Sequence, residues 1–372
     1  MIRTMVRVLG FLVVALMTLA VGGFGYLYLR KPAMVPPAHV RVESTPARLA
    51  RGRYLYNLAD CDGCHSLRDY SRFDGPVVES GRGRGTVFPP DLGLPGVVAA
   101  RNITPDKETG IGNWTDGEKI RAIREGISRD GTALFPMMGY ERFRHMSDED
   151  VYSLVAYLNT LTPIQNPLPR SKIIFPVSML MKGAPQPAGQ VPEPDRSSKV
   201  KYGEYLVAMA GCMECHTPAK QGKPVQGLTL AGGQEFRFPG AVVVSANITP
   251  DPQTGIGRWS EQYFLDHFYQ YKDYAEKGAP LVGPESFTVM PWLNFARLEP
   301  EDLKAIYAFL RTQQPVYHVV DSHPVWTSRL SPRSKATKAP ASSVIACNRK
   351  FPLLSDLQAG SRLRGDEPCG IP

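Results

Sequence analysis

Two cysteine motifs constrain this chain more than any other feature of its sequence. Both have the form C-x-x-C-H, they lie 151 residues apart, and they are Cys61-Asp62-Gly63-Cys64-His65 and Cys212-Met213-Glu214-Cys215-His216. In this pattern the two thiols add to the vinyl groups of a haem, and the adjacent histidine becomes the proximal iron ligand. The sequence therefore predicts two covalently bound haem c groups, with His65 and His216 as iron ligands. A zinc site would need a further C-x-x-C or H-x-H pair nearby, and the sequence has none. The remaining alternative to haem attachment is a redox dithiol or a pair of structural thiols.

The chain repeats itself around these motifs. A glycine stands nine residues before each first cysteine, at Gly52 and Gly203. Further along, each copy contains Asn-Ile-Thr-Pro-Asp, then Thr-Gly-Ile-Gly and a tryptophan, within residues 102–114 and 247–259. Because the order and spacing are kept, the sequence predicts two duplicated domains.

Each copy ends in a segment of helical periodicity with an acidic start. Its apolar residues recur at helical spacing, at Val151, Leu154, Val155 and Leu158 and at Leu303, Ile306, Tyr307 and Leu310. Ser147 and Asp150 predict a capping box at the start of the first of these helices. Glycine lets another backbone approach closely, so we expect Gly52 and Gly203 where the first and last helices of each domain cross. Tyr157 and Phe309 are expected near these crossings.

A methionine in each copy is predicted to be the distal iron ligand. Met138 and Met290 lie 73 and 74 residues after His65 and His216. Met138 is preferred to Met137 because it matches Met290 in a pattern of methionine, a small or cyclic residue, and an aromatic residue. A thioether ligand favours Fe(II) and raises the reduction potential, which is typical of an electron carrier.

Other residues offer weaker candidates for chemistry. Four further histidines compete for the distal positions: His145, His267, His318 and His323. None recurs at the equivalent place in the other repeat, so we interpret them as ordinary surface or core histidines. The Gly-Arg-Gly-Arg-Gly run at residues 81–85 lacks the preceding strand and following helix of a dinucleotide site, and we expect a flexible basic loop there. No catalytic constellation is found, and no catalytic residue is predicted.

Residues 1–32 are predicted to be a membrane anchor. Val8 to Leu29 runs for 22 residues without a charge, and at about 1.5 Å per residue such a helix crosses a hydrocarbon core of about 30 Å. A cleaved signal peptide is the alternative, but the nearest cleavage-like site, Thr18-Leu19-Ala20, lies inside the apolar run.

The expected compartment follows from charge and from haem attachment. Arg3 and Arg7 before the helix favour a cytoplasmic N-terminus, although basic residues also follow the helix. Haem c is attached on the outer side of the bacterial inner membrane, so the haem domains are predicted to be periplasmic. An oxidising periplasm favours a disulfide between the two remaining cysteines, Cys347 and Cys369.

Composition sets the expected boundaries and partners. The proline density of residues 163–198 resists regular structure and predicts a semi-rigid linker between cytochrome-like domains at 44–162 and 199–312. Residues 313–372 are predicted to be a C-terminal extension that lies along the domains or on a partner.

The net charge is +8, which suits an acidic redox partner or anionic lipid equally. Nucleic-acid binding is not expected, because no matching fold motif accompanies the charge.

Over residues 45–312 the chain resembles the class I c-type cytochromes. It is most similar to the membrane-bound multihaem cytochrome subunits of bacterial periplasmic dehydrogenases, such as those for alcohols, gluconate, aldehydes and isoquinoline-type substrates. The resemblance rests on the glycine-tyrosine-leucine segment before Cys61, both Asn-Ile-Thr-Pro-Asp segments, and Phe135-Pro136-x-Met138-x-Tyr140. Many relatives have three haem domains and this chain has two, so the resemblance does not imply a route to quinone.

The sequence as a whole predicts a mostly α-helical protein with two tandem class I cytochrome c domains and an N-terminal transmembrane helix. Its expected function is electron relay from a periplasmic dehydrogenase to a cytochrome, an oxidase or the quinone pool. The rival prediction is a dihaem peroxidase or thiosulfate-oxidising cytochrome, in which one distal ligand is displaceable. A purely structural or assembly subunit is a third possibility.

Overall fold

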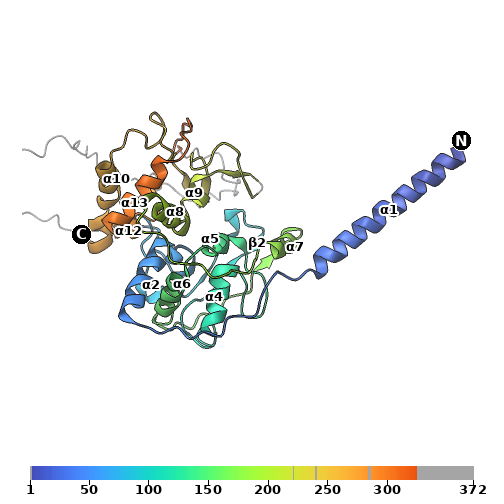
Figure 1. The fold of residues 1–372 in the computed structure, drawn as a ribbon, viewed down its shortest axis with the longest axis horizontal. Helices are drawn as coiled ribbons and strands as arrows, with labels where there is room; N and C mark the ends of the chain where they lie inside the picture. Colours follow the sequence, from blue (N-terminus) through green and yellow to red (C-terminus); the bar gives the residue numbers. More distant parts are fainter. Residues whose placement is uncertain (1, 221, 239–240, 284–285, 325–372) are drawn as a thin grey trace, which may run out of the picture. The chain divides into compact units, whose positions relative to one another are not determined.

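The computed structural model describes residues 2–220, 222–238, 241–283 and 286–324, and most of its regular structure is helical (Figure 1). Cys347 and Cys369, and with them the predicted disulfide, lie outside the described residues. So does the C-terminal extension beyond residue 324.

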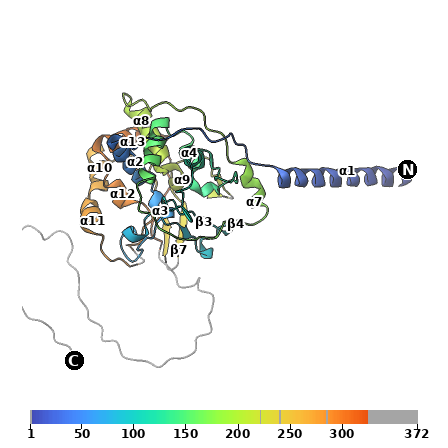
Figure 2. The same cartoon turned by 90° about the horizontal axis from the view of Figure 1, so that it is seen from below.

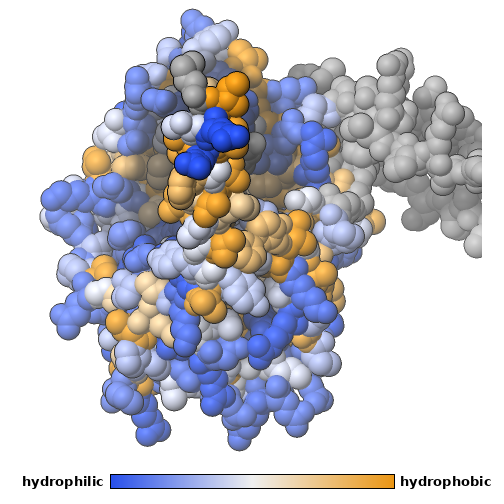
Figure 3. Space-filling model, turned by 90° about the vertical axis from the view of Figure 1, so that its right-hand side faces the viewer, coloured by the Kyte–Doolittle hydropathy of each residue, from blue (hydrophilic) through white to orange (hydrophobic). Residues whose placement is uncertain are grey.

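Helix α1 (Ile2–Leu29) is the predicted apolar N-terminal helix. Its mean hydropathy reaches 2.3 over 18 residues, and the helix is long and apolar enough to cross a membrane. Its side chains are almost all exposed, and in Figure 3 the hydrophobic colour gathers along it. The only aromatic contact between this helix and the rest of the described residues joins Phe24 to Phe175 of the 163–198 linker, with ring centroids 6.1 Å apart.

The first repeat is built from short helices around one long crossing pair. The pair is α2 (Pro46–Leu58) and α6 (Asp148–Leu158), which lie side by side in Figure 1. The remaining elements are α3 (Cys61–His65), η1 (Glu79–Gly81), β1 (Thr86–Val87), η2 (Pro90–Leu92), β2 (Gly96–Val97), β3 (Ala99–Ala100), α4 (Asp116–Glu125), η3 (Pro136–Met138) and α5 (Tyr140–Phe143). Strands β1 and β3 pair antiparallel.

The second repeat has the same order. Its crossing pair is α8 (Lys199–Ala210) and α13 (Pro300–Arg311). The remaining elements are α9 (Cys212–His216), β5 (Ala219–Lys220), β6 (Lys223–Pro224), β7 (Glu235–Phe238), β8 (Ala241–Val244), α10 (Glu261–Tyr269), α11 (Lys272–Lys277) and α12 (Trp292–Phe295). Helix α10 packs against α13, and α11 lies next to α12 (Figure 2). Strands β5 and β6, and β7 and β8, form antiparallel pairs.

The two predicted glycine crossings are confirmed. A Cβ on Gly52 would collide with the carbonyl oxygen of Ser153 and would lie 2.8 Å from the Cβ of Tyr157. In the second repeat a Cβ on Gly203 would collide with the Ala305 carbonyl oxygen. The predicted apolar faces of α6 and α13 are buried as well, apart from a partly buried Tyr307. Each domain therefore closes through a backbone contact that only glycine permits.

The predicted capping box on α6 is only half formed. The Ser147 hydroxyl accepts a hydrogen bond from the Asp150 backbone N–H at 3.1 Å, as expected. The Asp150 carboxylate does not return to Ser147; it accepts from Arg51 and Tyr205 instead. A complete capping box, which the sequence analysis missed, joins Thr115 and Glu118 at the start of α4.

The linker at 163–198 is more regular than predicted. Strand β4 (Lys172–Ile173) pairs antiparallel with β2 of the first repeat, and α7 (Val177–Leu180) and η4 (Met181–Gly183) follow it. The linker therefore contains short regular elements between its prolines, and one of them is paired through its backbone with a strand of the first repeat.

The two repeats contact each other through equivalent residues. The Tyr54 hydroxyl donates to Asp302 at 2.5 Å, and the Tyr205 hydroxyl donates to Asp150 at 2.6 Å. Tyr54 and Tyr205 are matching positions in the repeats, as are Asp150 and Asp302. Contacts of this reciprocal kind are typical of a two-fold interface between copies; here both copies belong to one chain.

Candidate haem-binding sites

The C-x-x-C-H motif of the first repeat opens onto a cavity of about 360 Å³. Cys61, Cys64, His65 and Met138 all line it. Most other lining residues are apolar, among them Ile111, Trp114, Ile123, Phe143, Leu154 and Leu158. Two thiols, an imidazole and a thioether around one apolar cavity are the donor set that a haem c requires.

The two motif histidines are oriented in the same way. Nδ1 of His65 lies 2.7 Å from the carbonyl oxygen of Arg101, and Nδ1 of His216 lies 2.7 Å from that of Ala246. A hydrogen bond from Nδ1–H to a carbonyl leaves Nε2 as the nitrogen that can bind iron. Burial lowers the pKa of both histidines, which favours the neutral imidazole that ligation needs.

The repeated Asn-Ile-Thr-Pro-Asp segments hold these carbonyls in place. Asn102 directly follows Arg101, and its side chain donates to Thr109 Oγ1 and to the Ile164 carbonyl at 3.0 and 2.7 Å. It also accepts from the Thr104 backbone N–H at 3.0 Å.

Asn247, which follows Ala246, makes the same set of contacts, with Thr254, Val316 and Thr249. In the sequence these segments are recognisable only as a repeat. Their recurrence after each C-x-x-C-H motif, 37 residues after His65 in the first copy and 31 residues after His216 in the second, was the signal that they serve the proximal histidine.

A glycine behind each histidine completes the proximal side. The backbone N–H groups of Gly85 and Gly232 donate to the carbonyls of His65 and His216, both at 2.7 Å. Gly85 has a φ of +78° and Gly232 one of +73°, and a Cβ on either would press against the backbone that orients the histidine.

Residues 81–85, expected to be a flexible loop, are part of this packed site. Gly81, Gly83 and Gly85 are buried, and Arg82 forms an ion pair with Asp62 inside the first motif. The prediction of a flexible loop was wrong, because folding buries these glycines and brings Arg82 to the buried Asp62 carboxylate.

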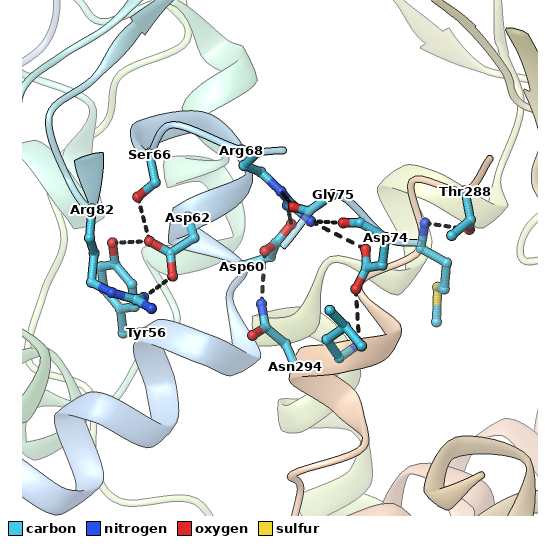
Figure 4. Close-up of polar contacts among 12 residues, drawn as sticks. Tyr56, Asp60, Asp62, Ser66, Arg68, Asp74, Gly75, Arg82, Thr288 and Asn294 are labelled. Carbon is cyan, nitrogen blue, oxygen red and sulfur yellow. Dashed lines mark hydrogen bonds and ion pairs between the residues drawn. The ribbon is translucent and has the colours of Figure 1, made fainter. Parts of the chain in front are cut away.

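Asp62 ties the first motif to its own domain (Figure 4). Its carboxylate accepts from the Tyr56 hydroxyl at 2.7 Å and from the Ser66 hydroxyl, and Arg82 pairs with it. The second motif has the partly exposed Met213 at this position, so the two haem sites differ in local charge although their ligand patterns match.

The predicted distal methionines lie in matching loops. Met138 ends η3 and lines the first cavity, as its neighbour Met137 also does, although Met137 is 41% exposed. Met290 is partly buried against the core of the second repeat, and its backbone N–H donates to Thr288 Oγ1 at 3.2 Å. The choice of Met138 over Met137 remains a prediction.

Among the competing histidines, His267 packs within an aromatic cluster of the second repeat. It occupies the position of the cavity-lining Ala122 in the first repeat and packs between Trp259 and Trp292, with ring centroids 4.8 and 5.3 Å away. By contrast, His145 is exposed, and His318 and His323 contact backbone carbonyls. Burial lowers the pKa of His267.

Buried carboxyl groups join the first motif to the distal loop of the second repeat (Figure 4). Asp60, directly before Cys61, accepts from the Asn294 side chain at 2.9 Å, and Asp74 accepts from the Leu293 backbone N–H at 2.9 Å. Arg68 lies 3.6 Å from Asp60 and 3.2 Å from Asp74. Burial raises the pKa of Asp60 to about 6 and that of Asp74 to about 7, with Arg68 opposing both shifts.

Comparison with protein families agrees with this geometry. The cytochrome c family model matches the chain twice, at residues 49–162 and 200–314. The chain belongs to the cytochrome c family. Two cytochrome c domains, each with a C-x-x-C-H motif, indicate two covalently bound haem c groups.

Similar proteins include cytochrome subunits of dehydrogenases. The chain is 31% identical over 287 residues to the cytochrome c subunit of a quinone alcohol dehydrogenase from Gluconacetobacter polyoxogenes, covering 74% of this chain and 58% of that one. It is 34% identical to a fructose dehydrogenase cytochrome subunit from Gluconobacter japonicus, covering 73% and 54%. A diheme cytochrome c-type protein from Cereibacter sphaeroides is 27% identical, covering 78% and 94%. The chain thus spans somewhat over half the length of the dehydrogenase subunits.

Proposed function

We propose that this chain is a dihaem electron relay whose two irons are six-coordinate. In the first domain Cys61 and Cys64 attach the haem, His65 is the proximal ligand and Met138 the distal one. In the second domain the corresponding residues are Cys212, Cys215, His216 and Met290. When bound, each haem would cycle between Fe(III) and Fe(II), which is the chemistry that a relay needs.

The observation that supports this proposal most strongly is the repeated hold on the proximal histidine. Two carbonyls, each fixed by an asparagine side chain, orient His65 and His216 through bonds of equal length. A rigid proximal side and an apolar cavity suit a site that keeps its ligands and excludes water while an electron passes.

Replacement of the distal methionines tests the ligand assignment. We expect Met138→Ala to keep its haem, to lower the reduction potential of the first domain and to let cyanide bind its iron. Met137→Ala is the matched control, because Met137 lines the same cavity, and it should leave both properties unchanged. An unchanged redox titration with no cyanide binding in Met138→Ala would refute the assignment.

The same two measurements on Met290→Ala and His267→Ala test which of the two residues is the distal ligand of the second haem. The proposal expects the potential to fall only in Met290→Ala. Peroxide turnover by the unmodified protein would instead support a dihaem peroxidase, in which one distal ligand is displaceable.

We propose a periplasmic dehydrogenase as electron donor and a respiratory cytochrome, oxidase or quinone pool as acceptor. The proposal rests on the names of the similar subunits and on α1, which would anchor residues 1–32 in the inner membrane with domains 44–162 and 199–312 in the periplasm. Stopped-flow mixing with a purified dehydrogenase and its substrate should reduce both haems. Failure of every such dehydrogenase from the same organism to reduce them would reject this donor class.

A further inference from the structure

Arg142, on α5 of the first domain, lies between the two haem-attachment motifs. It lines the first cavity together with Cys61, Cys64 and Met138. On its other side it approaches the second motif: a Cβ on Gly211, directly before Cys212, would lie 3.1 Å from the Arg142 Cζ. One guanidinium therefore contacts both haem sites.

The reciprocal interface explains this position. Arg142 is the fourth residue after Met138, and Asn294 is the fourth after Met290. Asn294 contacts Asp60, directly before the first motif, while Arg142 contacts Gly211, directly before the second. Each distal loop thus packs against the haem-attachment helix of the other domain. The pair differs in charge, because arginine in one copy is replaced by neutral asparagine in the other.

The surroundings of Arg142 leave much of its charge uncompensated. Its side chain folds back over Gly139, where a Cβ would lie 2.5 Å from Nη1. Its Nε is buried and has no hydrogen-bond partner among the residues that the structure describes. Within the described residues its ion-pair partner is Glu214, which is 3.9 Å away and half exposed.

We propose that Arg142 is a shared electrostatic control, a single cation that raises the reduction potentials of both haems together. The argument rests on the proposed haem attachment at the two motifs. Reduction adds an electron to each centre, and a buried positive charge nearby stabilises the reduced form. Because the charge lies at the junction of the domains, its removal affects two centres that belong to different repeats.

Spectroelectrochemical titration of the full chain in detergent tests this role. We expect Arg142→Met to reduce the equilibrium constant for reduction of both haems by about tenfold, which is about 59 mV for a one-electron centre. Arg142→Lys should retain most of the wild-type potentials. Asn294→Ala is the matched control, because it removes the equivalent contact of a neutral side chain. At pH 9, well above the pKa of about 6 of its partner Asp60, it should leave both potentials nearly unshifted.

Glu214→Gln provides an independent measurement on a half-exposed residue that tolerates substitution. Removing its negative charge should shift the potential of the second haem upward, opposite in sign to Arg142→Met. A shift confined to one haem in Arg142→Met, or no shift, would overturn the proposal, as would a downward shift in Glu214→Gln. Haem content and the spectra that report methionine ligation are recorded in parallel. If the wild-type protein lacked two haems or methionine ligation, the proposed function would be rejected instead.

Discussion

The two reciprocal tyrosine–aspartate contacts should differ in strength, although they occupy equivalent positions. Asp150 keeps two hydrogen bonds from Arg51, at 2.7 and 2.8 Å, besides the one from Tyr205. Asp302 is 7% exposed, and its other hydroxyl partner is Tyr202 at 3.4 Å. The position of Arg51 in the first repeat is that of Tyr202 in the second. Among the residues that the structure describes, Asp302 therefore has no cation equivalent to Arg51.

The expected magnitudes follow from this difference. Tyr54→Phe leaves a buried carboxylate with one long hydrogen bond, and a lost bond to a charged group costs about 3 kcal/mol at the upper end of the usual range. Tyr205→Phe leaves Asp150 paired with Arg51 and should cost about 1 kcal/mol. The Tyr205 hydroxyl also accepts from the Ser147 backbone N–H at 3.2 Å, and the cost of about 1 kcal/mol for Tyr205→Phe includes the loss of that bond.

Guanidinium unfolding of the detergent-solubilised chain, followed by circular dichroism and haem absorption, measures the difference. We expect Tyr54→Phe to be less stable than Tyr205→Phe by about 2 kcal/mol, or roughly thirtyfold in the folded-to-unfolded ratio. In an Asp302→Asn background the cost of Tyr54→Phe should fall, because the unpaired charge is gone. Equal losses in the two single variants, or a larger loss in Tyr205→Phe, would refute the reasoning.

Three further outcomes are expected. Gly52→Ala should lower the free energy of unfolding by about 3 kcal/mol, because the new Cβ meets a backbone carbonyl. Gly189→Ala is the control: a Cβ there meets nothing within 4 Å, and the free energy of unfolding should change by less than about 0.5 kcal/mol. Burial raises the folded-state pKa of Asp74 to about 7, above its unfolded value of about 4. The stability that the protonated Asp74 carboxyl contributes is therefore complete below pH 4 and is lost as pH rises through 7. Unfolding at pH 5 and pH 8 should therefore differ less in Asp74→Asn than in the wild type, and an unchanged difference would contradict this. Asn247→Ala should loosen the proximal histidine of the second domain and speed cyanide binding there; unchanged kinetics would show that the asparagine does not control ligation.

Local patterns were sufficient for the fold class and for the attachment chemistry. The C-x-x-C-H motif lies within about one helical turn, so its spacing alone implies a haem and a proximal ligand. Gly52 and Gly203 could be placed at helix crossings because both repeats kept them at the same distance from the cysteines. Residues 81–85 were misread, since the partner of Arg82 is a carboxylate 20 residues away that only folding brings close.

The sequence by itself determined that this chain has two cytochrome c domains, two haem c attachment motifs and an apolar N-terminal helix. Only the tertiary structure decided which carbonyls orient His65 and His216, and that each distal loop packs against the motif of the other domain. Tyr54 and Asp302 meet across 248 residues of sequence, and Arg142 reaches both motifs from α5. Such contacts depend on how the two repeats pack together, and no periodicity within one segment encodes that packing.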